Sequence, residues 1–193
     1  MTGESLGLLV EEQRTNLFTY SEFQSGVSGV GLVSQTELLG ALSENSKAVF
    51  YGYDGITTSY YYRGAVAAST QYTFSIYVKM SDGIAPSFGA ASGSSPLNDF
   101  CLVLANVLIN PLTYTVTYVG NGVYRVSGAA TSSNTGLTNN GVIKYASNSS
   151  RTFKTTGWQL EAGAFPTSYI KTEASQVTRA ADLATMTGAN FLS

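Results

Sequence analysis

The chain has 193 residues, of which 44% are hydrophobic and only 11% are charged, so it is long enough to bury the core of one domain. Its formal net charge of −2 excludes the strongly basic character that is typical of nucleic-acid-binding domains. The chain contains no histidine, which excludes Ser-His-Asp and Cys-His catalysis and zinc sites that rely on imidazole.

The first part of the chain gives few structural signals. Residues 6–10 form a short apolar run that we expect to be an edge strand, and the Gly/Ser-rich residues 25–33 are typical of a loop. Residues 35–42 are predicted to form one short helical turn. The sequence shows neither the basic flank of a secretory leader nor an apolar run long enough to span a membrane.

From residue 48 onward the sequence is typical of β-strands. The segment 71–80 is the clearest, because apolar and aromatic residues at even positions alternate with polar residues at odd positions. This alternation predicts a strand with one buried and one polar face. Asn121 and Gly122 predict a tight hairpin turn. In addition to the edge strand at 6–10, we expect eight strands, at residues 48–53, 58–67, 71–80, 100–109, 112–119, 123–128, 141–146 and 152–161.

About nine strands with turn signals between them predict an all-β fold, a two-sheet antiparallel β-sandwich of the jelly-roll or Greek-key type. Residues 81–95 and 129–140 are predicted to be loops. Residues 100–109 are apolar almost throughout, so we expect one strand that is covered on both faces. The composition changes after Lys171, which predicts a sandwich domain over residues 1–171 and an extended exit segment over 172–193 that packs against it.

Several short segments occur in order across nearly the whole chain. They read GLLVEE at 7–12, RTNL at 14–17, YTFSIYVK at 72–79, YRVS at 124–127, QLEAG at 159–163, TSYI at 167–170 and VTRAAD at 177–182. Together they resemble a carbohydrate-binding-like jelly-roll module of tail, fibre and other structural proteins of tailed bacteriophages. The chain departs from that pattern at Trp158, where a small residue is usual, and at Lys171, where a proline is frequent.

The resemblance implies a non-catalytic carbohydrate-binding module on the surface of a virion, outside the cell, that adsorbs the particle to host or environmental polysaccharide. It also implies neighbouring domains of a larger virion protein as partners, and neither nucleic acid nor membrane insertion. The alternative is a purely structural virion domain that mediates subunit or domain contacts. A glycoside-cleaving domain is a third hypothesis, but it needs two carboxylates in one cleft, and the spacing of the acids indicates no such pair.

Sugar rings stack on aromatic side chains, and their hydroxyls bind amides, carboxylates and guanidinium groups. Trp158, the only tryptophan, is one candidate platform. Strand alternation places it on the same face as Leu160, so the alternative is a core position. Gln159 and Glu161 lie on the opposite face and are candidate polar contacts for a ligand.

A second candidate surface contains Tyr61 and Arg63, in a run of three tyrosines and an arginine at 60–63. If the strands share one sheet, these two residues line a concave face with further candidates on other strands, and the alternative is ordinary cross-strand pairing on a solvated sheet. The further candidates for that face are Tyr77, Lys79, Arg125, Gln159 and Glu161.

The resemblance also raises a structural calcium ion near the start of the domain and its last strand. Glu22 and Glu161 are the candidate ligands. Calcium takes six to eight oxygen ligands, many of them from the backbone, and the sequence contains no dense acidic loop that would supply them. No cofactor is otherwise expected.

Overall fold

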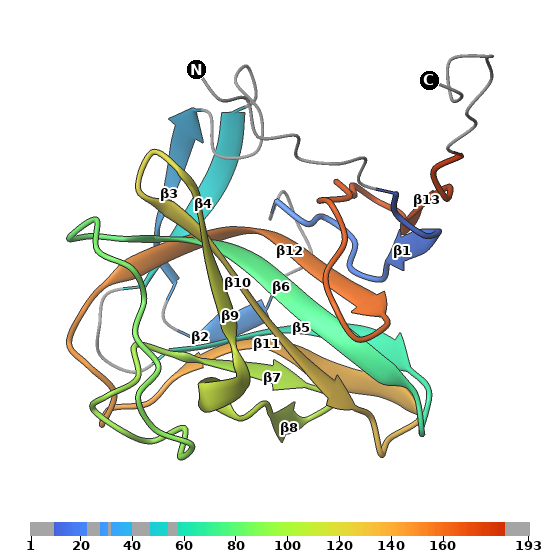
Figure 1. The fold of residues 1–193 in the computed structure, drawn as a ribbon. Helices are drawn as coiled ribbons and strands as arrows, with labels where there is room; N and C mark the ends of the chain where they lie inside the picture. The colour runs from blue at the N-terminus through green and yellow to red at the C-terminus, as the bar shows by residue number, and fades with distance from the viewer. Residues whose placement is uncertain (1–9, 23–27, 31, 40–46, 54–57, 184–193) are drawn as a thin grey trace, which may run out of the picture.

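The protein folds as an all-β sandwich of two antiparallel sheets (Figure 1), which confirms the predicted fold class. The computed structural model describes the backbone of residues 10–22, 28–30, 32–39, 47–53 and 58–183, and the side chains of residues 10–22 and 65–183. Most of the strand predicted at residues 6–10 lies outside these ranges. In the described part of the chain, no helix is long and apolar enough to cross a membrane.

Six strands form one sheet and five form the other, while the two ends of the described chain form a separate pair. The six-stranded sheet has the spatial order β3 (Leu32–Leu39), β4 (Lys47–Tyr53), β12 (Phe153–Ala162), β6 (Gln71–Met80), β10 (Val123–Thr131) and β9 (Thr115–Gly120). The five-stranded sheet has the order β2 (Ser28–Val30), β5 (Thr58–Val66), β11 (Gly136–Lys144), β7 (Cys101–Leu104) and β8 (Val107–Leu108). The separate pair is β1 (Arg14–Asn16) with β13 (Val177–Arg179), and a short 3₁₀ helix (Pro111–Thr113) precedes β9.

The core lies between the two large sheets and is organised around β6. Phe74, Ile76 and Val78 are completely buried on its inner face, as the alternation predicted. The facing sheet contributes Leu102 from β7 and Val142 from β11. Burial of these apolar side chains is the main favourable term for folding, because each removes a large apolar area from water.

The hairpin between β9 and β10 confirms the prediction from the Asn-Gly pair. Asn121 and Gly122 have φ angles of 53° and 73°, the left-handed values that a two-residue hairpin turn requires. The strand predicted over 100–109 is instead two short strands. Ala105 and Asn106 have φ angles of 54° and 65° and reverse the chain between β7 and β8.

Two other predictions are wrong. The expected helical turn at 35–42 is contradicted by β3, which is a strand up to Leu39 and pairs antiparallel with β4. The predicted loop at 129–140 is contradicted by β10, which continues to Thr131, and by β11, which begins at Gly136. Both segments satisfy their backbone groups by pairing with neighbouring strands, so tertiary pairing overrides the local sequence signal.

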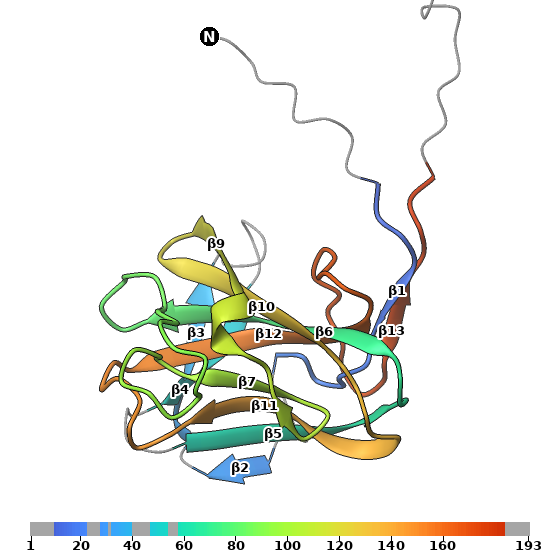
Figure 2. The same ribbon diagram turned by 60° about the horizontal axis from the view of Figure 1, so that its bottom comes forward.

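The chain enters and leaves the sandwich along one short ribbon (Figure 2). Arg14 pairs with Arg179 and Asn16 with Val177 in the β1–β13 pair. The hydroxyls of Thr15 and Thr178 are hydrogen-bonded at 2.7 Å. Residues 163–176 connect β12 to this ribbon and pack against the outer side of the six-stranded sheet.

Candidate functional site

Trp158 is a core residue and not a surface platform. It is 2% exposed, and its ring packs against Phe18 and Phe74 with centroid distances of 6.0 and 5.4 Å. Its indole Nε1 donates a hydrogen bond to Thr155 Oγ1 at 3.1 Å. A ligand outside the sandwich therefore cannot stack on this ring, and of the two alternatives from the sequence the core position is confirmed.

Gln159 and Glu161 do lie on the opposite face of β12, but the chain's own exit segment covers them. Both residues are 0% exposed. The Gln159 Oε1 accepts a hydrogen bond from the Ile170 amide at 2.6 Å, and the Glu161 carboxylate accepts from the amide of Thr167 at 3.0 Å and from its hydroxyl. These side chains fix the exit segment on the sheet, so the prediction that they face a ligand is wrong.

Asn16 joins the beginning, the last strand and the exit of the domain. Its side chain is completely buried. Nδ2 donates to the carbonyls of Trp158 and Ile170 at 3.1 and 2.9 Å, and Oδ1 accepts from the amides of Phe18 and Leu160, both at 3.1 Å. A residue inside the short RTNL segment thus organises three distant parts of the chain, a role that no local pattern reveals.

The two predicted calcium ligands are each engaged by protein groups. Glu22 forms an ion pair with Lys171 at 2.9 Å and accepts a hydrogen bond from the Tyr169 hydroxyl at 3.3 Å. Glu161 is bound to Thr167. In the described ranges no group of three His, Cys, Asp or Glu residues is placed to hold a metal ion, and the calcium site stays a prediction.

Two further acids, Asp82 and Asp99, are joined by Arg151. Arg151 contacts Asp82 at 2.8 Å and Asp99 at 2.5 Å. Hydrogen bonds from Arg151 lower the pKa of Asp82 to about 2. The ammonium group of the buried Lys144 donates to the backbone carbonyls of Asp99 and Arg151 at 3.0 and 2.7 Å. This network fixes the loop before β7 and leaves neither carboxylate free for acid–base chemistry.

The concave face predicted from four strands is divided between the two sheets. Tyr77, Lys79 and Arg125 lie together on the outer face of the six-stranded sheet, where Arg125 pairs with Tyr77. Tyr61 and Arg63 belong to β5 in the other sheet, and their side chains lie outside the described residues. The assumption that all these strands share one sheet is therefore wrong.

Tyr77 is buried, Arg125 is half-buried, and the two side chains contact each other. The Arg125 guanidinium lies 5.6 Å from the Tyr77 ring centroid, and its Nη2 donates to Ser75 Oγ at 2.9 Å. Tyr169 of the exit segment packs edge-on against Tyr77 at 5.7 Å. This burial raises the pKa of Tyr77, although the Arg125 charge opposes the change. Lys79 remains partly exposed.

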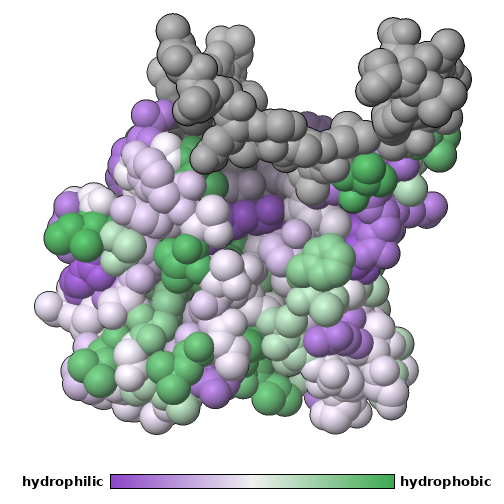
Figure 3. All heavy atoms as spheres, in the orientation of Figure 1, coloured by the Kyte–Doolittle hydropathy of each residue, from purple (hydrophilic) through white to green (hydrophobic). Residues whose placement is uncertain are grey.

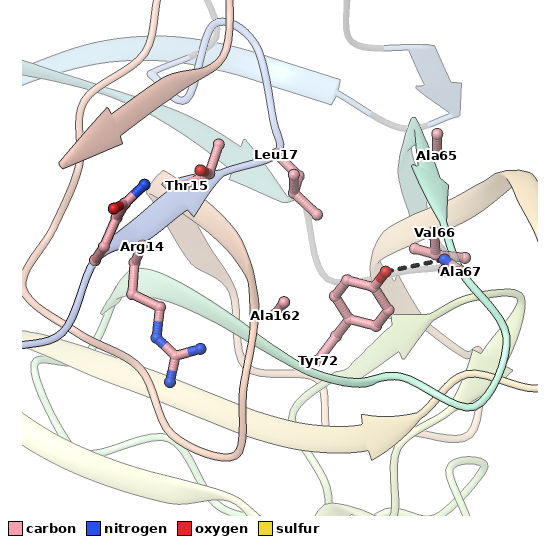
Figure 4. A pocket seen from close by; sticks show the side chains of 9 residues that line it. Arg14, Thr15, Leu17, Ala65, Val66, Ala67, Tyr72 and Ala162 are labelled. Carbon is pink, nitrogen blue, oxygen red and sulfur yellow. Dashed lines mark hydrogen bonds between the residues drawn. The ribbon is translucent and has the colours of Figure 1, made fainter. Parts of the chain in front are cut away.

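A groove of about 480 Å³ lies at the end of the sandwich and is called the end groove (Figure 4). Most of its polar groups already have protein partners. The Tyr72 hydroxyl accepts from the Ala67 amide at 2.9 Å, Thr15 is bonded to Thr178, and Arg14 stacks 5.5 Å from the Phe165 ring centroid. Its lining residues are Gln13, Arg14, Thr15, Leu17, Ala65, Val66, Ala67, Tyr72 and Ala162.

A smaller pocket on the outer face of the five-stranded sheet, the sheet-face pocket, has a different character. Its volume is about 280 Å³, close to the lower end of the range for small-molecule sites. Val103 and Leu108 are its apolar residues, and Asn106, Asn139 and Tyr145 are its polar ones. The side-chain amide of Asn139 and the hydroxyl of Tyr145 make no hydrogen bond within the described part of the chain.

The backbone holds the polar residues of the sheet-face pocket in place. The Asn106 amide donates to the Asn139 carbonyl at 3.0 Å, and the Asn139 amide donates to Asn106 Oδ1 at 2.8 Å. The Tyr145 amide donates to Asn148 Oδ1 at 2.9 Å. A Cβ atom at Gly93 would lie 2.5 Å from Leu108 and 3.1 Å from Tyr145, so this glycine allows the loop to pack behind both side chains.

The register of the five-stranded sheet aligns positions 61 and 63 of β5 with residues of this pocket. Tyr61 pairs with Gly141, Gly141 with Val103, and Val103 with Leu108, which places the four in one row across the sheet. Arg63 pairs with Asn139. Residues directly opposite in antiparallel strands share a face, and Gly141 has no side chain to fill the row between positions 61 and 103.

Sequence reasoning did not identify Asn106, Asn139 or Tyr145. Asn139 lies within the polar segment that was predicted to be a loop, and Asn106 interrupts the run that was predicted to be one strand. For Asn106 the useful signal was an Asn inside an otherwise apolar segment, because Asn tolerates the left-handed backbone of a tight turn.

On the face shown in Figure 3, apolar residues are scattered among polar ones and form no single large patch.

No protein-family model matches the chain, and the comparison with curated proteins finds no relative. The bacteriophage resemblance therefore depends on the short sequence segments alone.

Proposed function

We propose that this protein is a non-catalytic carbohydrate-binding domain of a phage tail or fibre protein, and that it binds polysaccharide at the sheet-face pocket. One observation carries the choice of site. The amide of Asn139 and the hydroxyl of Tyr145 are held beside an apolar floor, and neither makes a hydrogen bond with a residue whose side chain the structure describes. In the end groove the Tyr72 hydroxyl and Thr15 are already hydrogen-bonded. The sheet-face pocket instead offers an aromatic ring, polar groups with no hydrogen bond in the described part of the chain, and an apolar surface, which is the combination that sugars require.

Recognition in this pocket uses two kinds of contact. The apolar C–H face of a sugar ring packs on Val103, Leu108 and the Tyr145 ring, while ring hydroxyls exchange bound water for Asn139, Asn106 and the Tyr145 hydroxyl. A single shallow pocket gives weak affinity, because each hydrogen bond made in place of water contributes only about 0.5–1.5 kcal/mol. Several copies on one virion then supply the avidity that adsorption needs.

Affinity electrophoresis and glycan-array binding test this proposal. Asn139→Ala removes the free amide, and Tyr145→Phe removes only the hydroxyl, so both variants should fold. Each lost hydrogen bond should weaken binding by about 3–10-fold. Gln13→Ala in the end groove is the matched control and should bind like the wild type. Unchanged binding by both pocket variants, with loss in Gln13→Ala, would transfer the site to the end groove.

A second function, connecting domains or subunits of a larger virion protein, is favoured by the pairing of β1 with β13. In that case the domain is a spacer and binds no glycan. Sedimentation velocity of the isolated chain and the same glycan array distinguish the two functions. A stable trimer that binds no polysaccharide would support the connecting function and contradict the first proposal.

A further inference from the structure

Two lysines lie directly opposite each other on the outer face of the six-stranded sheet. Lys79 on β6 and Lys154 on β12 are register partners, so their Cβ atoms are about 4.5–5.5 Å apart and their positive charges repel. Like charges at directly opposed positions destabilise a sheet. A negative charge placed between these two lysines would therefore be stabilising.

Among the side chains that the structure describes, the positions around the two lysines supply no negative charge. The row across the sheet continues with Gly52 beyond Lys154 and Val123 beyond Lys79, and neither residue is acidic. Neither lysine forms an ion pair with any residue whose side chain the structure describes. Asp82, which follows Ser81 in the chain, is already bound to Arg151 at 2.8 Å.

The two lysines also share a concavity. A pocket of about 250 Å³ is lined by Lys79, Met80, Ser81 and Lys154. The Lys79 stem lies against the β9–β10 turn, because a Cβ atom at Gly122 would be 3.7 Å from Lys79 Cε. Arg125, one row away, points its guanidinium toward Ser75 and adds a third positive charge to the same face.

We propose that Lys79 and Lys154 form a binding site for an oxyanion, a sulfate or phosphate group that is either free or ester-linked to a polymer. An anion seated between the two ammonium groups accepts charge-assisted hydrogen bonds from both, and it converts their repulsion into attraction. The local charge, and not the composition of the whole chain, creates the site, since the net charge is −2. The site lies on the other sheet from the sheet-face pocket and does not depend on the proposed glycan binding.

Thermal unfolding in sodium sulfate or phosphate, compared with sodium chloride at equal ionic strength, tests the site. The wild type should gain about 3–8 °C in Tm at an anion concentration well above the dissociation constant, because binding only to the folded state stabilises it. Lys79→Gln and Lys154→Gln should lose this gain. Lys171→Gln is the control, since it removes the same charge at a distant position and should keep the gain.

Lys154→Glu gives a second readout that does not depend on added anion. It replaces the repelling pair by an attracting one, so its Tm at low salt should rise by about 1–4 °C, and sulfate should give it no further gain. Retention on dextran sulfate, compared with neutral dextran, identifies a polymer-borne anion, and the gain with inorganic sulfate identifies a free one. Equal responses of wild type and lysine variants to both forms, or no response of the wild type to either, would overturn the proposal.

Discussion

Replacing Asn16 should disconnect three parts of the chain at once. Its amide makes hydrogen bonds to backbone groups of Phe18, Trp158, Leu160 and Ile170 at 2.9–3.1 Å. The side chain is 0% exposed, so water cannot replace these bonds without opening the junction between the exit segment and β12. Asn16→Ala therefore leaves buried amides and carbonyls without their partners.

The size of the effect follows from the number of bonds. A hydrogen bond of this kind contributes about 1 kcal/mol net, and an unsatisfied buried group costs about 1–3 kcal/mol. The four bonds of Asn16 then give a loss of about 4 kcal/mol in the free energy of unfolding. In a chain of this size that corresponds to roughly 8–16 °C in Tm.

Asn16→Asp sharpens the test because it changes the chemistry without changing the shape. One carboxylate oxygen still accepts from the two amides, but the other faces the Trp158 and Ile170 carbonyls and can bind one of them only when protonated. Burial should raise the pKa of this Asp above its unfolded value of about 3.9. The folded state then holds more protons than the unfolded state, so stability relative to wild type should fall as pH rises above 4.

Urea denaturation of the wild type and both variants at pH 4 and pH 8, followed by the fluorescence of the single tryptophan, measures these changes. The midpoint of Asn16→Asp should approach that of the wild type at pH 4 and separate from it at pH 8. The reasoning about this junction is refuted if Asn16→Ala costs less than about 1 kcal/mol, or if Asn16→Asp shows no pH-dependent difference from the wild type.

Three further predictions concern other parts of the fold. Trp158→Ala should lower the free energy of unfolding by about 3–5 kcal/mol and leave the glycan affinity of the folded protein unchanged; a selective loss of affinity would contradict the core position. Because the pKa of Asp82 is lowered to about 2 by Arg151, the stabilisation from this pair is present above pH 3.8 and lost toward pH 2, so the Tm difference between wild type and Asp82→Asn should shrink over that interval. Burial raises the pKa of Cys101 to about 12, so a disulfide reagent at pH 8 should label it only after urea unfolding; rapid labelling of the native protein would show that the thiol is accessible.

Periodicity was sufficient to predict the strands whose two faces differ in polarity. The alternation over 71–80 correctly predicted β6 and its core residues, and the Asn121-Gly122 pair predicted the β9–β10 hairpin. The strand predicted over 100–109 failed because an apolar run conceals a reversal. The β7–β8 turn is marked only by Asn106, whose left-handed backbone is a property of one residue and not of a pattern.

The candidate site was harder to predict, because polarity along a strand does not reveal what covers it. The odd positions of β6 and the polar face of β12 read as solvated surface, yet Thr73, Ser75 and Gln159 are almost completely buried. The exit segment, which is adjacent in sequence to β12, folds back over Thr73 and Gln159, and Arg125 contacts Ser75. The sheet assignment of Tyr61 also depends on long-range pairing with Gly141, which one sequence does not encode in any local signal.

The antiparallel pairing of β1 and β13 has a mechanical consequence. Because the outer ends of these strands, Arg14 and Arg179, are paired with each other, a pull on the two ends of the domain loads the ribbon as a zipper. Its bonds break one after another at low force, and the tension reaches Asn16 only after they have opened. In a chain under load, the ribbon would therefore lengthen first, while the sandwich keeps its shape.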